Sequence, residues 1–442
     1  MNSASASHKK KAIRGQTLTF VGDPFQVQPN ESISYEADGA VVIEGGVIVD
    51  VGAAGDILKR HPQASVDHYP DCLIMAGFID AHVHYPQTEI IAAYGEQLLE
   101  WLNNYTFPVE SRFDDKAYAD AAATFFLEEC LRNGITTSSV YCTVHPQSVT
   151  SLFEKATKLG MRVVAGKVMM DRNAPDHLLD TPQLAYDQSE DLIRQWHGTG
   201  RCSYAITPRF APTSSPQQLE AAGALWAKYP DTLMQTHISE NHDEIAWVKE
   251  LFPGARDYLD VYETFGLVKS GANFGHALHL TEREIDSFRQ SGAGISHCPT
   301  SNTFIGSGLF KMADLRDNPQ PIAVGLATDI GGGTSFSMFD TMKSAYEIAQ
   351  LQGYSLHPAK AFYLATMGSA KLLQLDGVIG NLAAGYEADI QIIDLKSRPL
   401  ISERMSHARD IWDVLFAQMI MADDRAVRCV YSGGALIYER DK

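Results

Sequence analysis

Long apolar runs are absent from this sequence of 442 residues, and no apolar segment follows the basic residues near its start. A helix that spans a bilayer needs about 20 apolar residues, and a secretory signal needs an apolar stretch behind its charges. We therefore expect neither membrane insertion nor secretion. The six cysteines include no CxxC pair. A chain of this length needs no disulfides, so we expect reduced, mostly buried thiols in a cytoplasmic protein.

Basic residues are scarce as well. The chain has 36 Lys and Arg against 54 Asp and Glu, which gives a formal net charge of -18. Residues 1–15 carry basic residues and no acidic one, so we predict a flexible basic tail there and a strongly acidic body after it. Such a body repels a nucleic-acid backbone. We expect a small-molecule substrate as the partner, and neither nucleic acid nor a membrane.

Several catalytic signatures are also missing. The sequence has no GxSxG elbow for a nucleophilic serine and no GxGxxG for a dinucleotide. The glycines at 331–333 are not followed by the Lys-Ser/Thr pair of a phosphate loop. The HxE and PCxxC motifs of zinc cytidine deaminases are absent too. The sequence therefore does not indicate a nucleophilic serine, a dinucleotide site, a phosphate loop or the zinc site of cytidine deaminases.

Strand-like patterns occupy both ends of the chain. AVVIEGGVIVDVG at 40–52 and VRCVYSGGALIYER at 427–440 each place two β-rich runs around a Gly-Gly pair, which supplies the positive φ of a tight hairpin. ADIQIID at 388–394 is another strand. We predict that residues 16–72 and 386–442 pack together as one small β-sandwich domain.

Between the ends, apolar runs of strand length alternate with longer amphipathic segments. We count eight such runs, at 73–84, 135–143, 161–170, 202–210, 231–239, 272–280, 292–300 and 321–329. Segments between them, such as 117–134 and 215–229, have the periodicity of helices. Eight strand-helix units in series predict an α/β fold, a TIM-type (β/α)8 barrel over residues 73–385.

Side chains that bind metals stand where these strands end. His82 and His84 form an HxH pair, and residues two apart in a strand point to the same face. An HxH pair also arises by chance, but His237 closes the fifth run and Asp329 the eighth, and a barrel carries its site at this end. His276 closes the sixth run. Three neutral imidazoles and one carboxylate suit Zn²⁺ or Fe²⁺ with a position open for water.

Two motifs resemble the amidohydrolase superfamily. GFIDAHVH at 77–84 is similar to its first barrel strand, and GNLAAGYEADI at 380–390 to its return into the β domain. The resemblance covers nearly the whole chain and implies a metal-dependent hydrolase. Binuclear members carry a carboxylated lysine at the end of strand four, where this chain has Arg209, so the resemblance implies one metal per chain. Lys167 is the alternative lysine if strand three is in fact strand four.

The segment after strand five resembles mononuclear deaminases of that superfamily, in which His-x-x-Glu stands where this chain has His237 and Glu240. The resemblance implies that Glu240 transfers protons and that Asp329, besides binding metal, takes the proton of the attacking water. It also implies that His276 hydrogen-bonds the reacting oxygen. The alternative for Glu240 is a solvated residue at the start of a helix.

Four further segments resemble the guanine deaminases of this group: HVHYPQTE with Gln87, EWLNNYTFPVE at 100–110, PRF at 208–210 and TDIGGGTS at 328–335. The resemblance implies hydrolysis of guanine to xanthine and ammonia, in purine catabolism, by a homodimer. It places Gln87 and Arg209 on polar edges of guanine. Phe210 and Trp101 either cover a face of the base or belong to the core.

Two alternatives to this function stay open. One is a deaminase of another purine, a pterin or a triazine on the same fold, which ammonia release from a panel of purines distinguishes. The other is a noncatalytic scaffold, which metal bound to the purified protein excludes.

Overall fold

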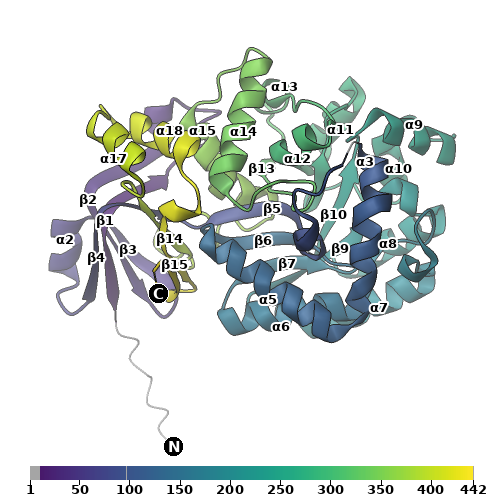
Figure 1. Ribbon diagram of the computed structural model, residues 1–442, viewed down its shortest axis with the longest axis horizontal. Coiled ribbons are helices and arrows are strands. Elements are labelled where there is room, and N and C mark those ends of the chain that lie inside the picture. The colour runs from purple at the N-terminus through teal and green to yellow at the C-terminus, as the bar shows by residue number, and fades with distance from the viewer. Residues whose placement is uncertain (1–9, 96, 442) are drawn as a thin grey trace, which may run out of the picture.

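The computed structural model describes residues 10–95 and 97–441. They form a sheet domain, built from both chain ends, and a barrel built from the middle of the chain (Figure 1). The first nine residues of the expected basic tail lie outside the described range. Strand β1 begins at Lys11, so the expected boundary at residue 15 is too late. Residues 11–20 are buried or half-buried and pair with β2 and β4 instead of extending into solvent.

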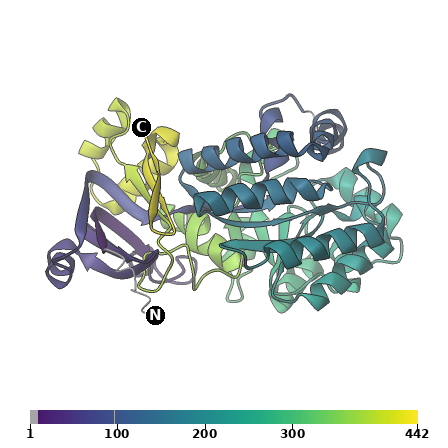
Figure 2. The ribbon, with the colours of Figure 1, turned by 90° about the horizontal axis from the view of Figure 1, so that it is seen from below.

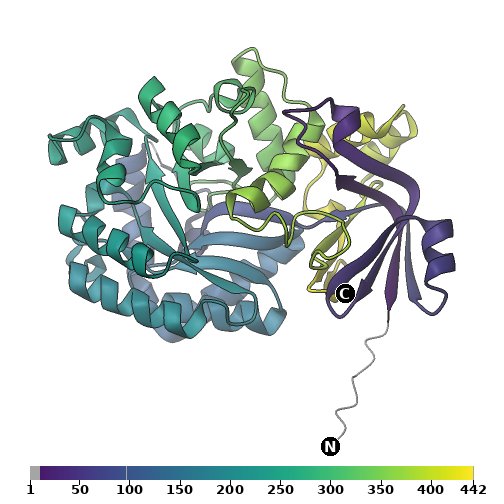
Figure 3. The ribbon, with the colours of Figure 1, turned by 180° about the vertical axis from the view of Figure 1, so that it is seen from behind.

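The sheet domain contains seven strands in the order β16-β15-β14-β4-β1-β2-β3. Their bounds are β1 (Lys11–Phe20), β2 (Ile33–Glu44), β3 (Val47–Ala53), β4 (Ser65–Ala76), β14 (Ile390–Asp394), β15 (Val427–Ser432) and β16 (Ala435–Glu439). Strand β1 is parallel to β4, and the other neighbours are antiparallel. Figure 3 shows strands from the two chain ends side by side in this domain.

Both predicted Gly-Gly hairpins are present. Gly45 and Gly46 have φ of 61° and 87°, and Gly433 and Gly434 have φ of 53° and 79°. The two turns meet, because a Cβ added to Gly46 would lie 2.9 Å from the carbonyl oxygen of Gly433. A side chain there would separate the hairpins, so glycine is required by the close approach as well as by the turn.

The barrel contains eight parallel strands in the order β13-β12-β11-β10-β9-β7-β6-β5, with the short β8 (Val168–Met169) beside β9. Their bounds are β5 (Phe78–His84), β6 (Ile135–Tyr141), β7 (Arg162–Gly166), β9 (Cys202–Pro208), β10 (Leu233–Ile238), β11 (Ala272–His276), β12 (Gly294–His297) and β13 (Val324–Leu326). Each lies within one of the eight predicted runs, so the predicted barrel is confirmed.

The first predicted run is divided between the two domains. Its residues 73–76 belong to β4, which pairs with β14 in the sheet domain, and its residues 78–84 form β5. The amide of Gly77 donates to Asp389, whereas that of Phe78 donates to Gly134 in the barrel. The chain therefore enters the barrel at Gly77, four residues later than the boundary expected at 72/73.

Helices cover the outside of the barrel (Figure 2). Those between barrel strands or after the last one are α5 (Lys116–Arg132), α6 (Pro146–Leu159), α7 (Pro182–Trp196), α8 (Pro216–Lys228), α9 (His242–Leu251), α10 (Tyr258–Thr264), α11 (Glu282–Ser291), α12 (Pro299–Phe304), α13 (Met312–Arg316), α14 (Met338–Leu351), α15 (Pro358–Tyr363) and α16 (Ser369–Leu372). Helix α5 begins after Asp115, whose side chain accepts from the amides of Ala117 and Tyr118, and it ends before Asn133.

The remaining helices complete the fold. They are α1 (Pro29–Ser32), α2 (Ala54–Arg60), α3 (Leu98–Trp101), α4 (Phe107–Glu110), α17 (Pro399–Ser406), α18 (Ile411–Met421) and the tight or wide helical turns η1 (Tyr85–Ile90), η2 (Leu102–Thr106), η3 (Ser111–Asp114), η4 (Asp176–Leu178), η5 (Ala211–Thr213), η6 (Leu364–Gly368) and η7 (Asp424–Ala426). In the described part of the chain, no helix has the length and apolarity to cross a membrane. All six cysteines are buried.

Arginines join the two domains: Arg162 of β7 pairs with Glu387 at 2.6 Å, and Arg201 makes the larger set of contacts. Arg201, just before β9, donates from Nε to Glu387 at 2.9 Å and from Nη1 to the carbonyl of Gly160 at 2.8 Å. It also pairs with Asp389, whose side chain is 2% exposed. Because Glu387 and Asp389 precede β14, this cation fixes the sheet domain against the lower end of the barrel.

We expect Arg201→Ala to lower the free energy of unfolding by about 3 kcal/mol, because the buried carboxylate of Asp389 loses its cation. Urea-induced unfolding followed by circular dichroism measures the effect. Arg194→Ala is the control: Arg194 is 60% exposed beside Glu190, and a surface pair contributes about 0–1 kcal/mol. Equal losses for the two variants would contradict the role given to Arg201.

Candidate active site

Four side chains converge at the ends of three barrel strands. His82 and His84 come from β5, His237 from β10 and Asp329 from the loop after β13. The Nε2 atoms of His84 and His237 are 3.1 Å apart. Oδ1 of Asp329 lies 3.3 Å from Nε2 of His82 and 3.5 Å from Nε2 of His84. The structure thus brings together the four residues that the strand ends suggested.

The buried ring nitrogens in this group lack ordinary partners. Neither nitrogen of His82 makes a hydrogen bond, nor does Nδ1 of His84, whereas Nδ1 of His237 lies 2.7 Å from the carbonyl oxygen of Arg209. Burial, followed by the charges of the other histidines and Arg209, lowers the pKa of His84 and His237 well below 6.5. Neutral imidazoles with open nitrogens are suited to a metal ion.

Asp329 supplies a negative charge to these rings. Burial would raise its pKa, but the adjacent His82 and the charges of the other histidines lower it to about 2. The carboxylate is therefore ionised at every physiological pH. Three neutral nitrogens and one carboxylate form a donor set that fits Zn²⁺ or Fe²⁺.

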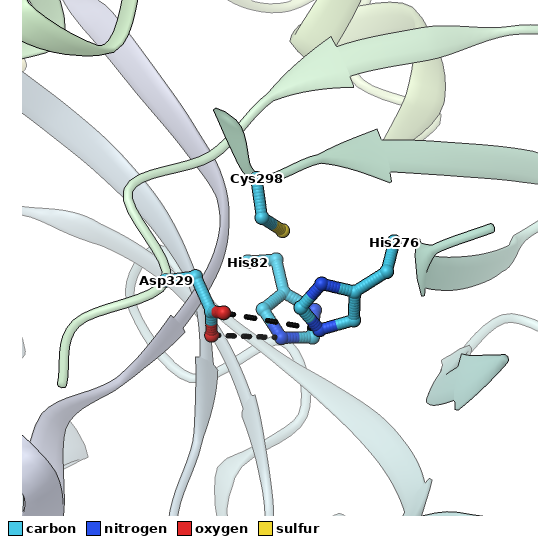
Figure 4. A group of neighbouring side chains, drawn as sticks. All are labelled: His82, His276, Cys298 and Asp329. Carbon is cyan, nitrogen blue, oxygen red and sulfur yellow. Dashed lines mark ion pairs between the residues drawn. The ribbon is translucent and has the colours of Figure 1, made fainter. Parts of the chain in front are cut away.

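A second group shares two of these residues. This second group consists of His82, His276, Cys298 and Asp329 (Figure 4). Each side chain offers one possible ligand atom, and these four atoms lie within 4.8 Å of one another. Burial raises the pKa of the Cys298 thiol well above 9, so its sulfur remains protonated. Burial lowers the pKa of His276, but Glu240 and Asp329 raise it above 6.5. The group of His82, His84 and His237 offers three imidazoles, and the carboxylate of Asp329 lies 3.3 Å and 3.5 Å from two of them, so these four residues form the donor set that better fits Zn²⁺ or Fe²⁺.

Glu240 lies beside this cluster in the loop that follows β10. Its Oε2 is 3.3 Å from Nε2 of His276, and its Oε1 accepts from the hydroxyl of Ser307 at 3.0 Å. Burial raises its pKa to about 7, against the opposing effect of His276. Glu240 is 3% exposed, so it is not the solvated residue of the alternative. A carboxyl group half-protonated near neutral pH is able both to donate and to accept a proton.

Two further side chains, Glu244 and Asn302, hold Glu240 and His276 in place. Glu244 accepts hydrogen bonds from the backbone amides of Glu240 and Asn241 at 2.8 Å and 3.1 Å, which fixes the loop. The oxygen of the Asn302 side chain lies 2.8 Å from Nδ1 of His276. With Nδ1 protonated toward that oxygen, Nε2 of His276 faces Glu240.

Backbone strain is concentrated here. His276 has φ of 70° and Asp329 has φ of 51°, in the left-handed region that non-glycine residues rarely adopt. The amide of Asp329 donates to the carbonyl of His82 at 3.0 Å. Gly275 leaves room for His82, since a Cβ there would lie 2.6 Å from Cε1 of its ring.

A pocket opens above these residues, with about 440 Å³ of space that protein atoms do not fill and that is continuous with solvent. It is lined by His84, Gln87, Leu98, Trp101, Leu102, Arg209, Phe210, His237, Glu240, His276, Ser301, Ile305, Asp329 and Gly332. All four residues expected on the substrate side are in this lining. Phe210 and Trp101 are buried and also belong to the wall.

The family is decided by a comparison with known sequences. The amidohydrolase family model matches residues 73–437. The chain belongs to the amidohydrolase family. A bacterial imidazolonepropionase-like composite domain matches residues 39–64. The guanine deaminase of Escherichia coli (strain K12) is 46% identical over 441 residues, which are 99% of this chain and 100% of that protein.

Solved structures agree with this amidohydrolase architecture. E. coli guanine deaminase superposes with a TM-score of 0.95 over 98% of this chain and 100% of that chain. The structure of guanine deaminase from C. acetobutylicum, with guanine bound in its active site, is 28% identical and superposes with a TM-score of 0.88, covering 97% of this chain and 100% of that chain.

Lys167, the alternative for a lysine that bridges two metals, is not among the residues that line the pocket of this amidohydrolase. Lys167 follows β7, the third barrel strand, and is fully buried in an ion pair with Asp180. Arg209 follows β9, the fourth barrel strand, and faces the pocket. The strand count on which the single-metal prediction depends is therefore right.

Sequence reasoning missed one charged residue next to the pocket of this amidohydrolase. Glu110 ends α4 and is fully buried, with its carboxylate against both Gln87 and Arg209. It lies in the segment 100–110 and not at the end of a predicted strand. The rule that barrel sites lie at strand ends, which identified the other polar residues, therefore did not identify Glu110. A buried acid in a helical segment gives no signal without its partners.

Proposed function

We propose that this amidohydrolase hydrolyses guanine to xanthine and ammonia. The observation that carries the proposal is the likeness over the full chain length to guanine deaminases, together with a pocket whose polar wall suits a purine. The same architecture also occurs in enzymes that act on other rings, so the polar groups of the wall decide the substrate.

The side chains proposed to hold one metal ion are His82, His84, His237 and Asp329. Their open nitrogens and ionised carboxylate fit Zn²⁺, with Fe²⁺ as the alternative. An ion bound there supplies Lewis acidity, which makes water a nucleophile near neutral pH. The protein residues then supply every proton transfer.

The proposed reaction begins when Asp329 accepts a proton from the attacking water. The water oxygen forms a bond to C2 of guanine, and the π electron pair of the C2=N3 double bond moves to N3. Glu240 protonates N3, and C2 and N3 remain joined by a single bond. His276, held by Asn302, donates a hydrogen bond to the oxygen at C2. Glu240, now ionised, takes the proton of the new hydroxyl at C2 and delivers it to the 2-amino group, so that the C2–N bond to this group breaks with its electron pair, ammonia leaves and C2 becomes a carbonyl carbon. The proton held by Asp329 then returns to Glu240.

Arg209 and Gln87 are proposed to recognise the lactam edge of guanine, because a guanidinium donates to O6 and an amide both donates and accepts. Phe210 and Trp101 contact the faces of the base. The likeness to guanine deaminases also supports a homodimer and a cytoplasmic location as proposals. Light scattering behind size-exclusion chromatography measures the oligomer.

Glu240→Gln should retain the metal while turnover falls about 10³–10⁴-fold, because the amide keeps the size of the side chain but moves no proton. Steady-state ammonia release and elemental analysis measure both quantities. Glu282→Gln, an exposed residue of α11, is the control and should leave turnover unchanged. Turnover above about a tenth of the wild-type value in Glu240→Gln would refute the assigned role.

Substrate selectivity tests the function itself. Guanine should be deaminated about 10⁴-fold faster than adenine, because adenine lacks O6 and leaves Arg209 without an acceptor. Adenine also carries its amine at C6, away from the reacting position. Ammonia release by metal-loaded protein from guanine, adenine, a pterin and a triazine measures the order. A higher kcat/KM for any of the other rings would assign the enzyme to that substrate instead.

A further inference from the structure

Glu110 lies immediately behind the substrate wall. Its Oε2 accepts from Nη1 of Arg209 at 2.7 Å, and its Oε1 accepts from Nε2 of Gln87 at 3.0 Å. Glu110 is not among the residues that line the pocket, whereas Arg209 and Gln87 both are. One buried carboxylate therefore holds the two polar residues that are proposed to recognise the lactam edge of guanine, and it does not itself line the pocket.

The carboxylate fixes the direction of the Gln87 amide. An ionised carboxylate only accepts hydrogen bonds, so the end of Gln87 that faces it has to be the NH₂ group. The amide oxygen is then the end turned away from Glu110, and the backbone amide of Gly331 donates to it at 3.5 Å. A carbonyl oxygen has two lone pairs, so it keeps an acceptor site for a ligand.

The guanidinium of Arg209 is held in the same way. Its side chain and that of Glu110 are 3% and 1% exposed, so water does not replace this contact. The guanidinium also lies over the ring of Phe107, with 5.9 Å between its carbon and the ring centroid. Phe107 and Glu110 are the two ends of α4, so this one helical turn sets the position of Arg209.

We propose that Glu110 is a positioning residue that sets the order of donors and acceptors along the pocket wall and thereby the orientation of the purine. The proposal rests on guanine as the substrate. Because Arg209 and the NH₂ of Gln87 share one carboxylate, two donors stand together at the Glu110 end. The acceptor oxygen of Gln87 stands at the other end.

The lactam edge of guanine matches that order in one direction. O6 accepts from the paired donors, and N1–H donates to the oxygen of Gln87. With O6 and N1 fixed in this way, C2 and its amino group point away from the Glu110 end. If the amide of Gln87 turned over, its oxygen would face O6 and its NH₂ would face N1–H, so both contacts would be repulsive.

The test compares guanine with 2-aminopurine, which keeps the amine at C2 but lacks O6 and N1–H. In Glu110→Gln, Gln87 is free to turn and Arg209 loses its anchor. We expect kcat/KM for guanine to fall about 100-fold, the size of a lost hydrogen bond to a charged group. The value for 2-aminopurine should not fall, because this purine makes neither contact and its N1, an acceptor, gains a donor when the amide of Gln87 turns. The guanine/2-aminopurine ratio therefore falls about 100-fold.

If Glu110 only stabilised the fold, its substitution would change kcat/KM for the two purines differently from the proposal. If Glu110→Gln lowers kcat/KM for both purines equally, or leaves that for guanine unchanged, the proposal is wrong. Glu284→Gln is the matched control, since Glu284 is another buried glutamate, bonded to Thr281 and to the amide of Leu259. It should leave the ratio unchanged. Elemental analysis and thermal unfolding confirm that each variant is folded and holds its metal.

A conservative variant covers the case in which Glu110→Gln does not fold. Glu110→Asp keeps the charge next to Arg209 but shortens the reach, so the same ratio should fall by less, about 10-fold. An unchanged ratio would overturn the proposal. Wild-type protein is assayed first: if it releases no ammonia from guanine, the proposed function fails, whereas activity with an unaltered ratio in the variants contradicts only the role of Glu110.

Discussion

The closure of the barrel between its first and last strands is the constraint on which the site depends. The amide of Asp329 donates to the carbonyl of His82, and the amide of His84 donates to the carbonyl of Ile330 at 2.9 Å. Beneath them, the buried carboxyl of Asp80 accepts from the backbone and side chain of Thr328. These bonds place histidines from the start of the barrel beside an aspartate from its end. The left-handed backbone at Asp329 persists because this seam holds it from both sides.

Burial then gives each group at the seam its protonation state. Removal from water favours neutral imidazoles at His84 and His237, and it raises the pKa of Glu240 to about 7. Asp329 stays ionised, because the rings around it offset the cost of burial. The same environment therefore produces neutral imidazoles, an ionised carboxylate and a carboxyl group that can both donate and accept a proton within one pocket, as the proposed metal site and reaction require. The acidic surface of the protein is not needed to explain any of them.

The sequence allowed the eight barrel strands and the polar residues at their ends to be predicted, because both follow from periodicity and from the rule that barrel sites lie at carboxyl ends of strands. The boundary at Gly77 was missed, since the apolar run 73–84 continues through it and only hydrogen bonding separates its two halves. Glu110 was missed for a related reason. Its importance comes from Gln87 and Arg209, which reach it from other parts of the chain, and such contacts leave no local pattern.

Anomalous diffraction from crystals of the zinc-loaded protein tests the central claim most directly. The account predicts one peak per chain at the zinc edge, about 2.0–2.2 Å from ring nitrogens of His82, His84 and His237 and from an oxygen of Asp329. A peak coordinated by the sulfur of Cys298 and by His276, or a second peak of equal height in the same pocket, would contradict it.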